Sequence, residues 1–288
     1  MLLKGNELVE KRNILNEIRR NDMTLQELRL FSIYLAKINA RDVSTRKVKF
    51  KLEDFQKIMG IEKVTLAHLR TAAKHLLQKV VEVPFEDGQP GFNAFQLFKR
   101  FVLRRDDENF AQWYIEIDAH DDALPLMFDF KKNYLTYDIG NVLRLTGRNQ
   151  FRMYELLKQY EQIGMREISL EQLKSWLGID VDKYQEWDNF RKYVLDSCQK
   201  ALKENTDIEY EYEKIKSGRK VVAVRFLIKK NESYKSPLSL EEFLKEDKPA
   251  KPTAKTPPTK PAKQAQRKFS LTPSDSFTTD DLAKKFDI

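Results

Sequence analysis

The sequence predicts an α+β fold of two tandem domains that arose by internal duplication, and three observations predict it. The segment LEDFQKIMGI (52–61) returns 118 positions later as LEQLKSWLGI (170–179). A short alternating run typical of a strand precedes each copy, VKFK in the first and REIS in the second. A longer helical stretch and then strand-like residues follow each copy. The repeated unit is therefore strand, helix, turn, helix and hairpin.

The two repeated segments are predicted to be short helices that end at a glycine. They share Leu, Glu, Gly and Ile at matching places, and Phe55 corresponds to the apolar Leu173. Ser169 is a favourable N-cap, because its hydroxyl accepts a hydrogen bond from a free backbone N–H of the first turn. Gly60 and Gly178 fit a helix C-terminus that requires a positive φ. Each short helix is expected to support the longer helix behind it.

The first domain is predicted to span residues 1–130. It begins with polar, cation-rich residues to about Asp22. Thr24 and Glu27 then form a capping box before the helix LRLFSIYLAKI. After the repeated unit, the alternating segments VVEVPF, FQLFKRFVL and WYIEID indicate an antiparallel sheet. Residues 121–134 connect this domain to the next.

The second domain is predicted to span residues 131–232. It opens with TYDIGNVLRL and GRNQFRMYELLKQY, both at helical spacing, and closes with DIEYEYEKIKSGRKVVAVRFLI. Alternating residues on both sides of Ser217 and Gly218 predict a two-stranded hairpin. Residues 233–288 are predicted to be a flexible linker and tail. Within them, 248–268 is a Pro/Lys-rich segment with seven basic residues, no acidic residue and five prolines, which is expected to be disordered.

The composition of the chain favours a polyanionic partner. Its 288 residues suffice for two domains, and 52 Lys and Arg against 44 Asp and Glu give a net charge of +8. The sequence contains neither an apolar run long enough to cross a membrane nor a signal peptide, so we expect a cytoplasmic protein with no membrane partner. The single cysteine excludes an internal disulfide.

The order helix, turn, helix and hairpin predicts a winged-helix domain, whose second helix enters the major groove while the hairpin, or wing, contacts the DNA backbone. In the second domain the second helix is 189–205, and Phe190, Val194 and Cys198 share its apolar side. The opposite, outer row includes Gln199, and long cationic and amide side chains of this kind suit base edges and phosphates. The predicted DNA-contacting residues on this helix are Asn189, Arg191, Lys192, Lys200 and Lys203. The alternative is the solvated face of an ordinary helix.

The turn of the second hairpin supplies an independent basic set. Lys216, Arg219 and Lys220 cluster where a wing would approach phosphates. Lysines are common in surface turns, and that is the alternative for this set alone. Two basic sets at the two positions that a winged helix uses favour the second domain as the main DNA reader.

The sequence evidence for DNA contact is weaker in the first domain. Its longer helix, 65–79, directs Thr71 and Lys74 outward, and the nearby turn EDGQPG is acidic. We therefore expect this domain to contact DNA more lightly or to serve in self-association. The strand-like region that follows holds further cations available to a DNA backbone, namely Lys99, Arg100, Arg104 and Arg105.

Catalytic, metal and cofactor sites are not expected, and we predict that the protein is not an enzyme. The sequence contains no GxxxxGK[ST] phosphate loop and no His-x-His pair. Cys198 lies on the apolar side of its helix, so it is predicted to be a core residue. Asp118, His120, Asp121 and Asp122 could suggest a metal site, but a polar loop at a strand end explains them more simply.

The ordered segments GRNQFRMYELLKQY, ISLEQLKSWLGI, FRKYVLDSCQKALKENTDIEYEY and GRKVVAVRF resemble the Rep-type initiator proteins of iteron-containing, theta-replicating plasmids. The resemblance covers about residues 6–230 and is densest from Tyr134 onward. It implies two winged-helix domains from an ancient duplication, with the recognition helices at 65–79 and 189–205. It also implies binding to directly repeated origin sequences as a monomer, and to an operator-like inverted repeat as a dimer that represses its own gene.

The sequence thus predicts a bacterial initiator that binds double-stranded DNA at an origin and opens it. The alternative within DNA binding is a winged-helix transcriptional repressor without a replication role, and the alternative outside it is an interaction scaffold or a nicking enzyme. The C-terminal tail lies outside the resemblance. It is either disordered or a docking segment for a host replication protein through Phe269 and Leu271.

Overall fold

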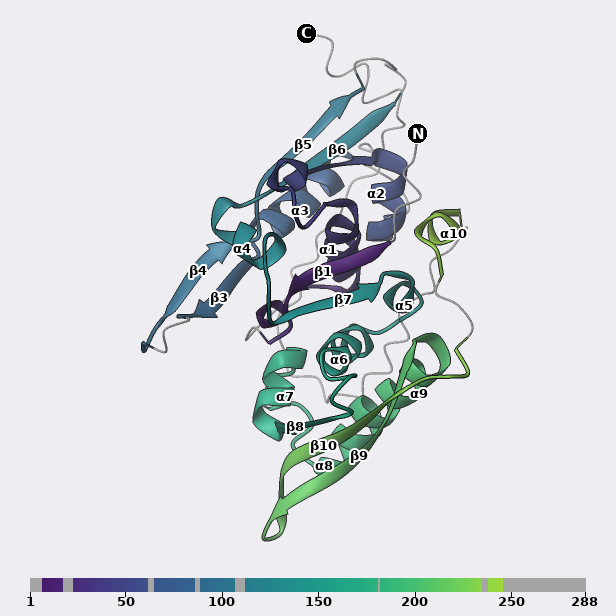
Figure 1. Ribbon diagram of the computed structural model, residues 1–288. Coiled ribbons are helices and arrows are strands. Elements are labelled where there is room, and N and C mark those ends of the chain that lie inside the picture. The colour runs from purple at the N-terminus through teal and green to yellow at the C-terminus, as the bar shows by residue number, and fades with distance from the viewer. Residues whose placement is uncertain are drawn as a thin grey trace, which may run out of the picture.

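The computed structural model describes residues 7–17, 23–61, 65–85, 89–106, 112–180, 182–234 and 238–245. It contains two units, one above the other, with a two-stranded ribbon between them (Figure 1). The elements up to Met127 are β1 (Leu8–Arg12), η1 (Asn13–Asn16), α1 (Leu25–Lys37), η2 (Val43–Arg46), β2 (Lys47–Lys51), α2 (Leu52–Met59), α3 (Leu66–Leu77), β3 (Val80–Pro84), β4 (Phe92–Gln96), β5 (Phe98–Arg105), β6 (Trp113–Ala119), η3 (Asp121–Ala123) and α4 (Leu124–Met127). The later elements are β7 (Tyr134–Asp138), α5 (Gly140–Leu143), α6 (Arg148–Lys158), β8 (Met165–Ser169), α7 (Leu170–Leu177), α8 (Trp187–Phe190), η4 (Arg191–Leu195), α9 (Asp196–Asn205), β9 (Ile208–Ser217), β10 (Lys220–Lys230) and α10 (Leu240–Lys245).

The duplication is visible in the two three-stranded antiparallel sheets, whose strand orders are β2-β6-β5 and β8-β10-β9. In each sheet the strand before the supporting helix pairs with the last strand of the unit. One side of the first sheet is covered by α2 and α3, and one side of the second sheet is covered by α7 and α9. The predicted α+β fold, with a strand, two helices and a hairpin in each of two tandem units, is confirmed. An additional ribbon, β3-β4, belongs to the first unit.

The predicted signals for the ends of the helices are present. The Thr24 hydroxyl accepts a hydrogen bond from the Glu27 N–H (3.2 Å), and the Thr24 N–H donates to the Glu27 carboxylate (2.7 Å), which is the capping box of α1. Ser169 accepts from the Gln172 N–H (3.2 Å) at the start of α7. The helices α2 and α7 end at Gly60 and Gly178, with φ of 65° and 66°.

We expect Gly60→Ala and Gly178→Ala each to lower the free energy of unfolding by about 1–2 kcal/mol, because an L side chain is strained in the left-handed region. Among the described residues, a Cβ on Gly60 would meet nothing nearer than 3.8 Å, whereas one on Gly178 would overlap the Arg148 guanidinium and displace it. Urea unfolding of both variants measures the costs. Gly60→Asn is the control, since asparagine tolerates this conformation. An equal cost for alanine and asparagine at Gly60 would contradict the backbone explanation.

The ribbon between the units was not predicted. The residues before Asp22 were expected to form a polar N-terminal segment without strand structure, and TYDIG was expected to be helical. Instead, β1 pairs with β7, with Leu8 opposite Asp138 and Arg12 opposite Tyr134. Inward-facing residues alternate along both strands, which is a strand period and not a helical one. They are Val9, Lys11, Leu135 and Tyr137. The predicted boundary between 1–130 and 131–232 stays a prediction, and β1 and β7 lie on either side of it.

Part of the predicted flexible tail is helical. α10 packs against the first unit: Phe243 is buried, Lys57 Nζ donates to the Leu244 carbonyl (2.5 Å) and the Leu240 N–H donates to Glu7 (2.8 Å). The physical reason is that the proline- and lysine-rich composition begins only after residue 247, while Leu238 and Phe243 supply apolar anchors. Residues 246–288, with the predicted linker and the docking residues Phe269 and Leu271, lie outside the described residues.

No helix in the described part of the chain is both long and apolar enough to cross a membrane.

Candidate nucleic-acid interface

The candidate recognition helix of the second unit is continuous from Trp187 to Asn205 and is formed by α8, η4 and α9. Its apolar side is buried against the unit through Phe190, Val194, Cys198 and Leu202, each no more than 1% exposed. The middle segment η4 is a π-helical turn. Val194 and Leu195, adjacent in this turn, are both buried in the core. Such turns are frequent at functional sites, and the sequence did not predict this one.

The five predicted contact residues of this helix all lie exposed on its outer side. Arg191 pairs with Asp188 (3.7 Å) and Asp196 (3.1 Å). Lys200 lies 3.9 Å from Glu204, and Lys203 lies 3.4 Å from Glu209. Lys192 Nζ lies 5.5 Å from the centre of the Tyr193 ring, and Asn189 is exposed near the start of the helix. Exposed ion pairs contribute about 0–1 kcal/mol, so an approaching phosphate can replace them at little cost.

Gln199 departs from the prediction. It was expected on the outer row, but its Nε2 donates to the Tyr210 carbonyl of β9 (2.8 Å), and the side chain is half-buried. The Tyr210 hydroxyl also donates to the Leu195 carbonyl (2.9 Å), and the Tyr212 hydroxyl bonds to Asp196. These bonds fix the recognition helix against the wing, so helix and hairpin present one surface.

The wing is the hairpin β9-β10. Ser217 pairs with Lys220, so the two-residue loop is Gly218-Arg219, one position later than the sequence indicated. Gly218 has a φ of 60°, which favours glycine at this loop position. Lys216, Arg219 and Lys220 are exposed at its tip. Within the residues that the structure describes, no acidic group pairs with these three, so their charge is available to phosphates.

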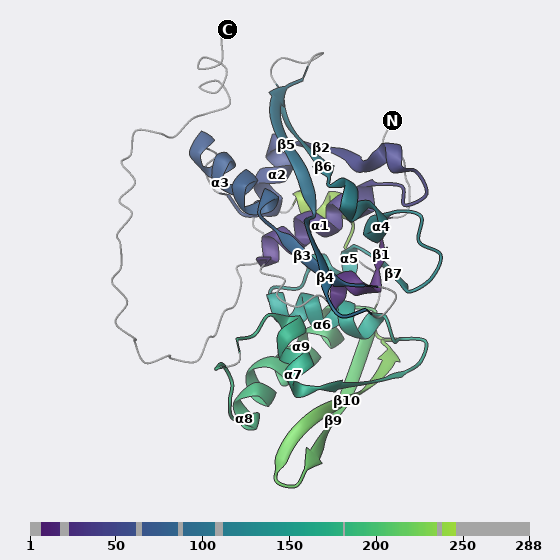
Figure 2. The same ribbon diagram turned by 90° about the vertical axis from the view of Figure 1, so that its left-hand side faces the viewer.

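The candidate recognition helix of the first unit, α3, carries two cations where that of the second unit carries four. Thr65 caps α3 by accepting a hydrogen bond from the His68 N–H (3.1 Å), and Thr71 and Lys74 are exposed as predicted. Arg70 is exposed as well and escaped the prediction, although it directly precedes Thr71. In Figure 2, α3 and α8 lie on the left-hand side of the upper and lower units, and the wing β9-β10 extends at the bottom.

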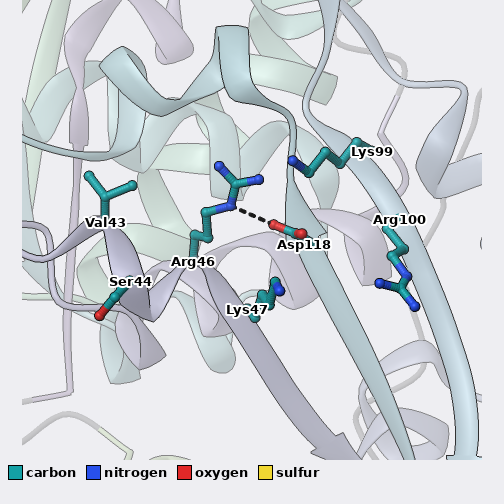
Figure 3. Close-up of a pocket in the computed structure, with 7 residues that line it drawn as sticks. All are labelled: Val43, Ser44, Arg46, Lys47, Lys99, Arg100 and Asp118. Atoms are coloured by element: carbon teal, nitrogen blue, oxygen red, sulfur yellow. Dashed lines mark hydrogen bonds and ion pairs between the residues drawn. The ribbon is translucent and has the colours of Figure 1, made fainter.

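The cluster considered for a metal site belongs to an ion-pair network. Arg46 contacts Asp118 (2.8 Å) and Asp121 (2.6 Å), and Lys99 also bonds to Asp121 (2.9 Å). Lys99 and Arg46 lower the pKa of Asp121 to about 2. Arg46, Lys99 and Asp118 line a pocket over the β2-β6-β5 sheet, and Figure 3 shows their side chains. These carboxylates are therefore matched by cations. Burial also raises the pKa of the Cys198 thiol, a core residue as predicted.

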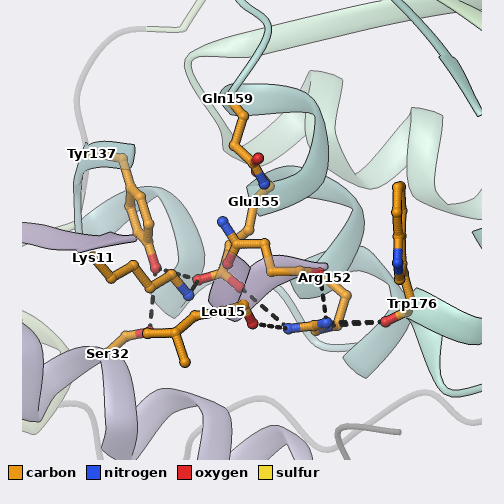
Figure 4. A network of polar contacts seen from close by, with 9 residues as sticks. Lys11, Leu15, Ser32, Tyr137, Arg152, Glu155, Gln159 and Trp176 are labelled. Atoms are coloured by element: carbon orange, nitrogen blue, oxygen red, sulfur yellow. Dashed lines mark hydrogen bonds and ion pairs between the residues drawn. The ribbon is translucent and has the colours of Figure 1, made fainter. Parts of the chain in front are cut away.

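A buried polar network lies between the two units (Figure 4). Lys11 Nζ of β1 donates to Glu155 of α6 (2.5 Å), both being almost fully buried. The Tyr137 hydroxyl of β7 donates to the same Glu155 oxygen (2.7 Å), and Ser32 of α1 lies 3.2 Å from Tyr137. Burial lowers the pKa of Lys11 and raises that of Tyr137.

Arg152 extends this network to the second unit. Its guanidinium donates to the carbonyls of Asn16 (2.8 Å) in η1 and Trp176 (3.0 Å) in the supporting helix α7. It also approaches Glu155 at 4.0 Å. One buried cation thus contacts the backbone of both units. Since α7 supports the recognition helix, this network constrains how the second reader is oriented relative to the first unit.

Two family models match the chain. A model described as "Initiator Replication protein, WH1" matches residues 8–158, and one described as "Initiator Rep protein, WH2" matches residues 169–228. A comparison with curated proteins gives no significant match. The first model includes β7 and α6, and the second runs from the end of β8, through the recognition helix, to β10. Together the two matches cover most of the described residues.

Proposed function

Because this chain belongs to the family of plasmid replication initiator (Rep) proteins, we propose that it binds the directly repeated sequences, or iterons, of a plasmid origin. Binding uses both winged-helix domains, with the second as the dominant reader. Several copies bound side by side promote opening of the origin. A dimer of the same chain binds an operator-like inverted repeat and represses its own gene.

The observation that carries this proposal is the combined basic surface of the second unit. The helix from Trp187 to Asn205 and the wing are held together by hydrogen bonds, and both direct cations outward. The helix supplies Arg191, Lys192 and Lys200 for base edges and phosphates. The wing supplies a separate group of cations for the backbone. This arrangement matches the way winged helices bind duplex DNA.

The proposed mechanism is non-enzymatic and needs no cofactor. Two recognition helices on one chain would enter successive major grooves, and a row of bound copies would deform the DNA beside them. A·T-rich segments with flexible steps open at the lowest cost in deformation energy. The protein's contribution is binding energy, which it converts into strain in the duplex.

A transcriptional repressor without a replication role is the second candidate. A footprint on the DNA that flanks the gene separates the two: protected direct repeats support the initiator, and a single protected inverted repeat supports the repressor. Maintenance of a plasmid that carries this gene and origin provides the functional readout. An origin fragment that replicates equally well without the protein would refute the initiator proposal.

The wing gives a prediction of its own. Changing Lys216, Arg219 and Lys220 together to glutamine should weaken origin and random duplex alike, because phosphate contacts carry no sequence information. A plot of log affinity against log salt has a negative slope. The magnitude of this slope should decrease by up to about 2.7, since each lost contact removes about 0.9. Gel-shift titrations over a salt series measure it. Lys131→Gln with Lys132→Gln, an exposed pair in the connector, is the control. A slope that stays at the wild-type value would remove the wing from the interface.

A further inference from the structure

The three-stranded sheet of the first unit has one covered face and one open face. In an antiparallel sheet, residues directly opposite each other share a face. The rows Val48-Ile117-Phe101 and Phe50-Ile115-Leu103 point into the core. The alternate rows point outward, away from α2 and α3. They are Lys47-Asp118-Arg100, Lys49-Glu116-Val102 and Lys51-Tyr114-Arg104.

This outer face is strongly basic at its surface. Its five cations, Lys47, Lys49, Lys51, Arg100 and Arg104, are all exposed. The acidic side chains between them, Glu116 and Asp118, are no more than 9% exposed, and Asp118 is paired with Arg46. The five cations lack ion pairs within the described residues. Carboxylates therefore lie underneath while the positive charges face solvent.

Aromatic packing positions some of these cations. Lys49 Nζ lies 4.6 Å from the centre of the Tyr114 ring, and the Arg104 guanidinium lies 5.9 Å from it. The hollow at the end of the face, about 620 Å³, is lined by Arg46, Lys47, Lys99 and Arg100. Figure 3 shows Lys47, Asp118 and Arg100 side by side across the three strands. The face is thus an arranged row of cations beside a concave surface.

The second unit provides an internal comparison, since its sheet has the same strand order. The equivalent outer row there is Glu167-Arg225-Glu213, with Arg225 paired to the two glutamates at 3.1 and 3.7 Å. The next row, Met165-Leu227-Glu211, contains no cation. A basic outer face is therefore not a consequence of the fold, and it occurs in the unit whose candidate recognition helix carries fewer cations.

We infer that the outer face of the β2-β6-β5 sheet is a phosphate-binding surface for the backbone of duplex DNA, separate from α3 and from the second recognition helix. Regularly spaced exposed cations complement a regularly spaced polyanion. A second copy of this chain would bring like charges together, which opposes pairing through the same face. This inference rests on the proposed function and adds to it a surface that binds DNA without reading its sequence.

The test uses the full chain with Lys47→Gln and Arg100→Gln together, two cations that flank Asp118 in one row. Affinities for an origin duplex and for a random duplex several helical turns long are measured over a salt series. We expect the magnitude of the negative slope of log affinity against log salt to decrease by about 1.8 on both duplexes, from two contacts at about 0.9 each. The charge-preserving variant Lys47→Arg with Arg100→Lys should keep the wild-type slope. Lys131→Gln with Lys132→Gln is the matched control, and thermal melting verifies that each variant is folded.

Each outcome is decisive. A wild-type slope for the Lys47→Gln and Arg100→Gln variant overturns the inference, and the face would then suit an acidic protein instead. A loss confined to the origin duplex also overturns it, because backbone contacts act on every sequence. Wild-type protein that binds neither duplex would instead refute the proposed function itself. The two failures are therefore distinguishable.

Discussion

Replacing Glu155 by glutamine should lower the free energy of unfolding by about 3–5 kcal/mol, because it leaves buried cations without their counter-charge. Lys11 and Glu155 are both almost inaccessible to solvent, and Arg152 is buried beside them. Glutamine has nearly the same shape, so the loss reports charge and not a cavity. Urea unfolding of the variant measures it. The control is Glu161→Gln, which removes the partly exposed partner of Lys158 and should cost less than about 1 kcal/mol.

The pH dependence of this variant follows from Lys11. Burial already lowers the pKa of Lys11, and removal of Glu155 lowers it further in the folded state. Between this folded pKa and the ordinary value for an unfolded lysine, the unfolded chain binds more protons, so stability increases with pH. The deficit of Glu155→Gln should therefore shrink as the pH rises toward that ordinary value. A deficit independent of pH would show that the hydrogen bonds of Glu155, not its charge, matter most.

A double-mutant cycle measures the interaction energy between Lys11 and Glu155 apart from their contacts with other residues. Lys11→Met removes the buried cation and lets Glu155→Gln be introduced without an orphaned lysine. The double variant should be more stable than the sum of the two single losses predicts, because adjacent charges couple. Additive losses would mean that the two residues do not depend on each other.

Local signals in the sequence predicted the repeated parts of the fold. The capping residues, the two glycines with positive φ and the alternation around Gly218 each act within a few residues, so they can be read along the chain. The pairing of β1 with β7 could not be read in this way, because the partners are far apart in sequence and only tertiary packing selects them. α10 was missed because the composition of the tail concealed its few apolar anchors.

The same distinction between local signals and tertiary contacts applies to the candidate site. Helical spacing was sufficient to place Arg191 and Lys200 on the outer side of their helix. It could not show that Gln199 bonds to the wing, since that contact depends on where β9 packs. The basic face of the first sheet likewise depends on strand register, which brings Lys47 and Arg100 to either side of Asp118. The sequence singled out Arg100 and Arg104 together with Lys99 and Arg105, which lie outside these rows, but not the three lysines of β2.

Arg191→Ala and Lys200→Ala should each weaken specific origin binding by about 1–3 kcal/mol, the cost of losing a good base or phosphate contact. The loss of affinity should be larger for Arg191→Ala, because removing Arg191 leaves Asp188 and Asp196 facing the DNA phosphates without a cation. Gel-shift titration on origin and random duplexes measures the losses. Wild-type affinity for both variants would refute the assignment of this helix as the reader.

Arg191→Lys then distinguishes base reading from phosphate binding. Lysine keeps the charge but lacks the planar fork that bonds a guanine edge twice. If Arg191 reads a base, Arg191→Lys should lose preference for the origin duplex while its salt slope stays close to wild type. If Arg191 binds phosphate, both quantities should change little. The first-domain pair Thr71→Ala and Lys74→Ala provides the comparison between the two recognition helices. Its loss is expected to be smaller because α3 carries two cations and the helix of the second unit carries four. Losses as large as those of Arg191 and Lys200 would mean that the two readers contribute equally, against the inequality that their surfaces indicate.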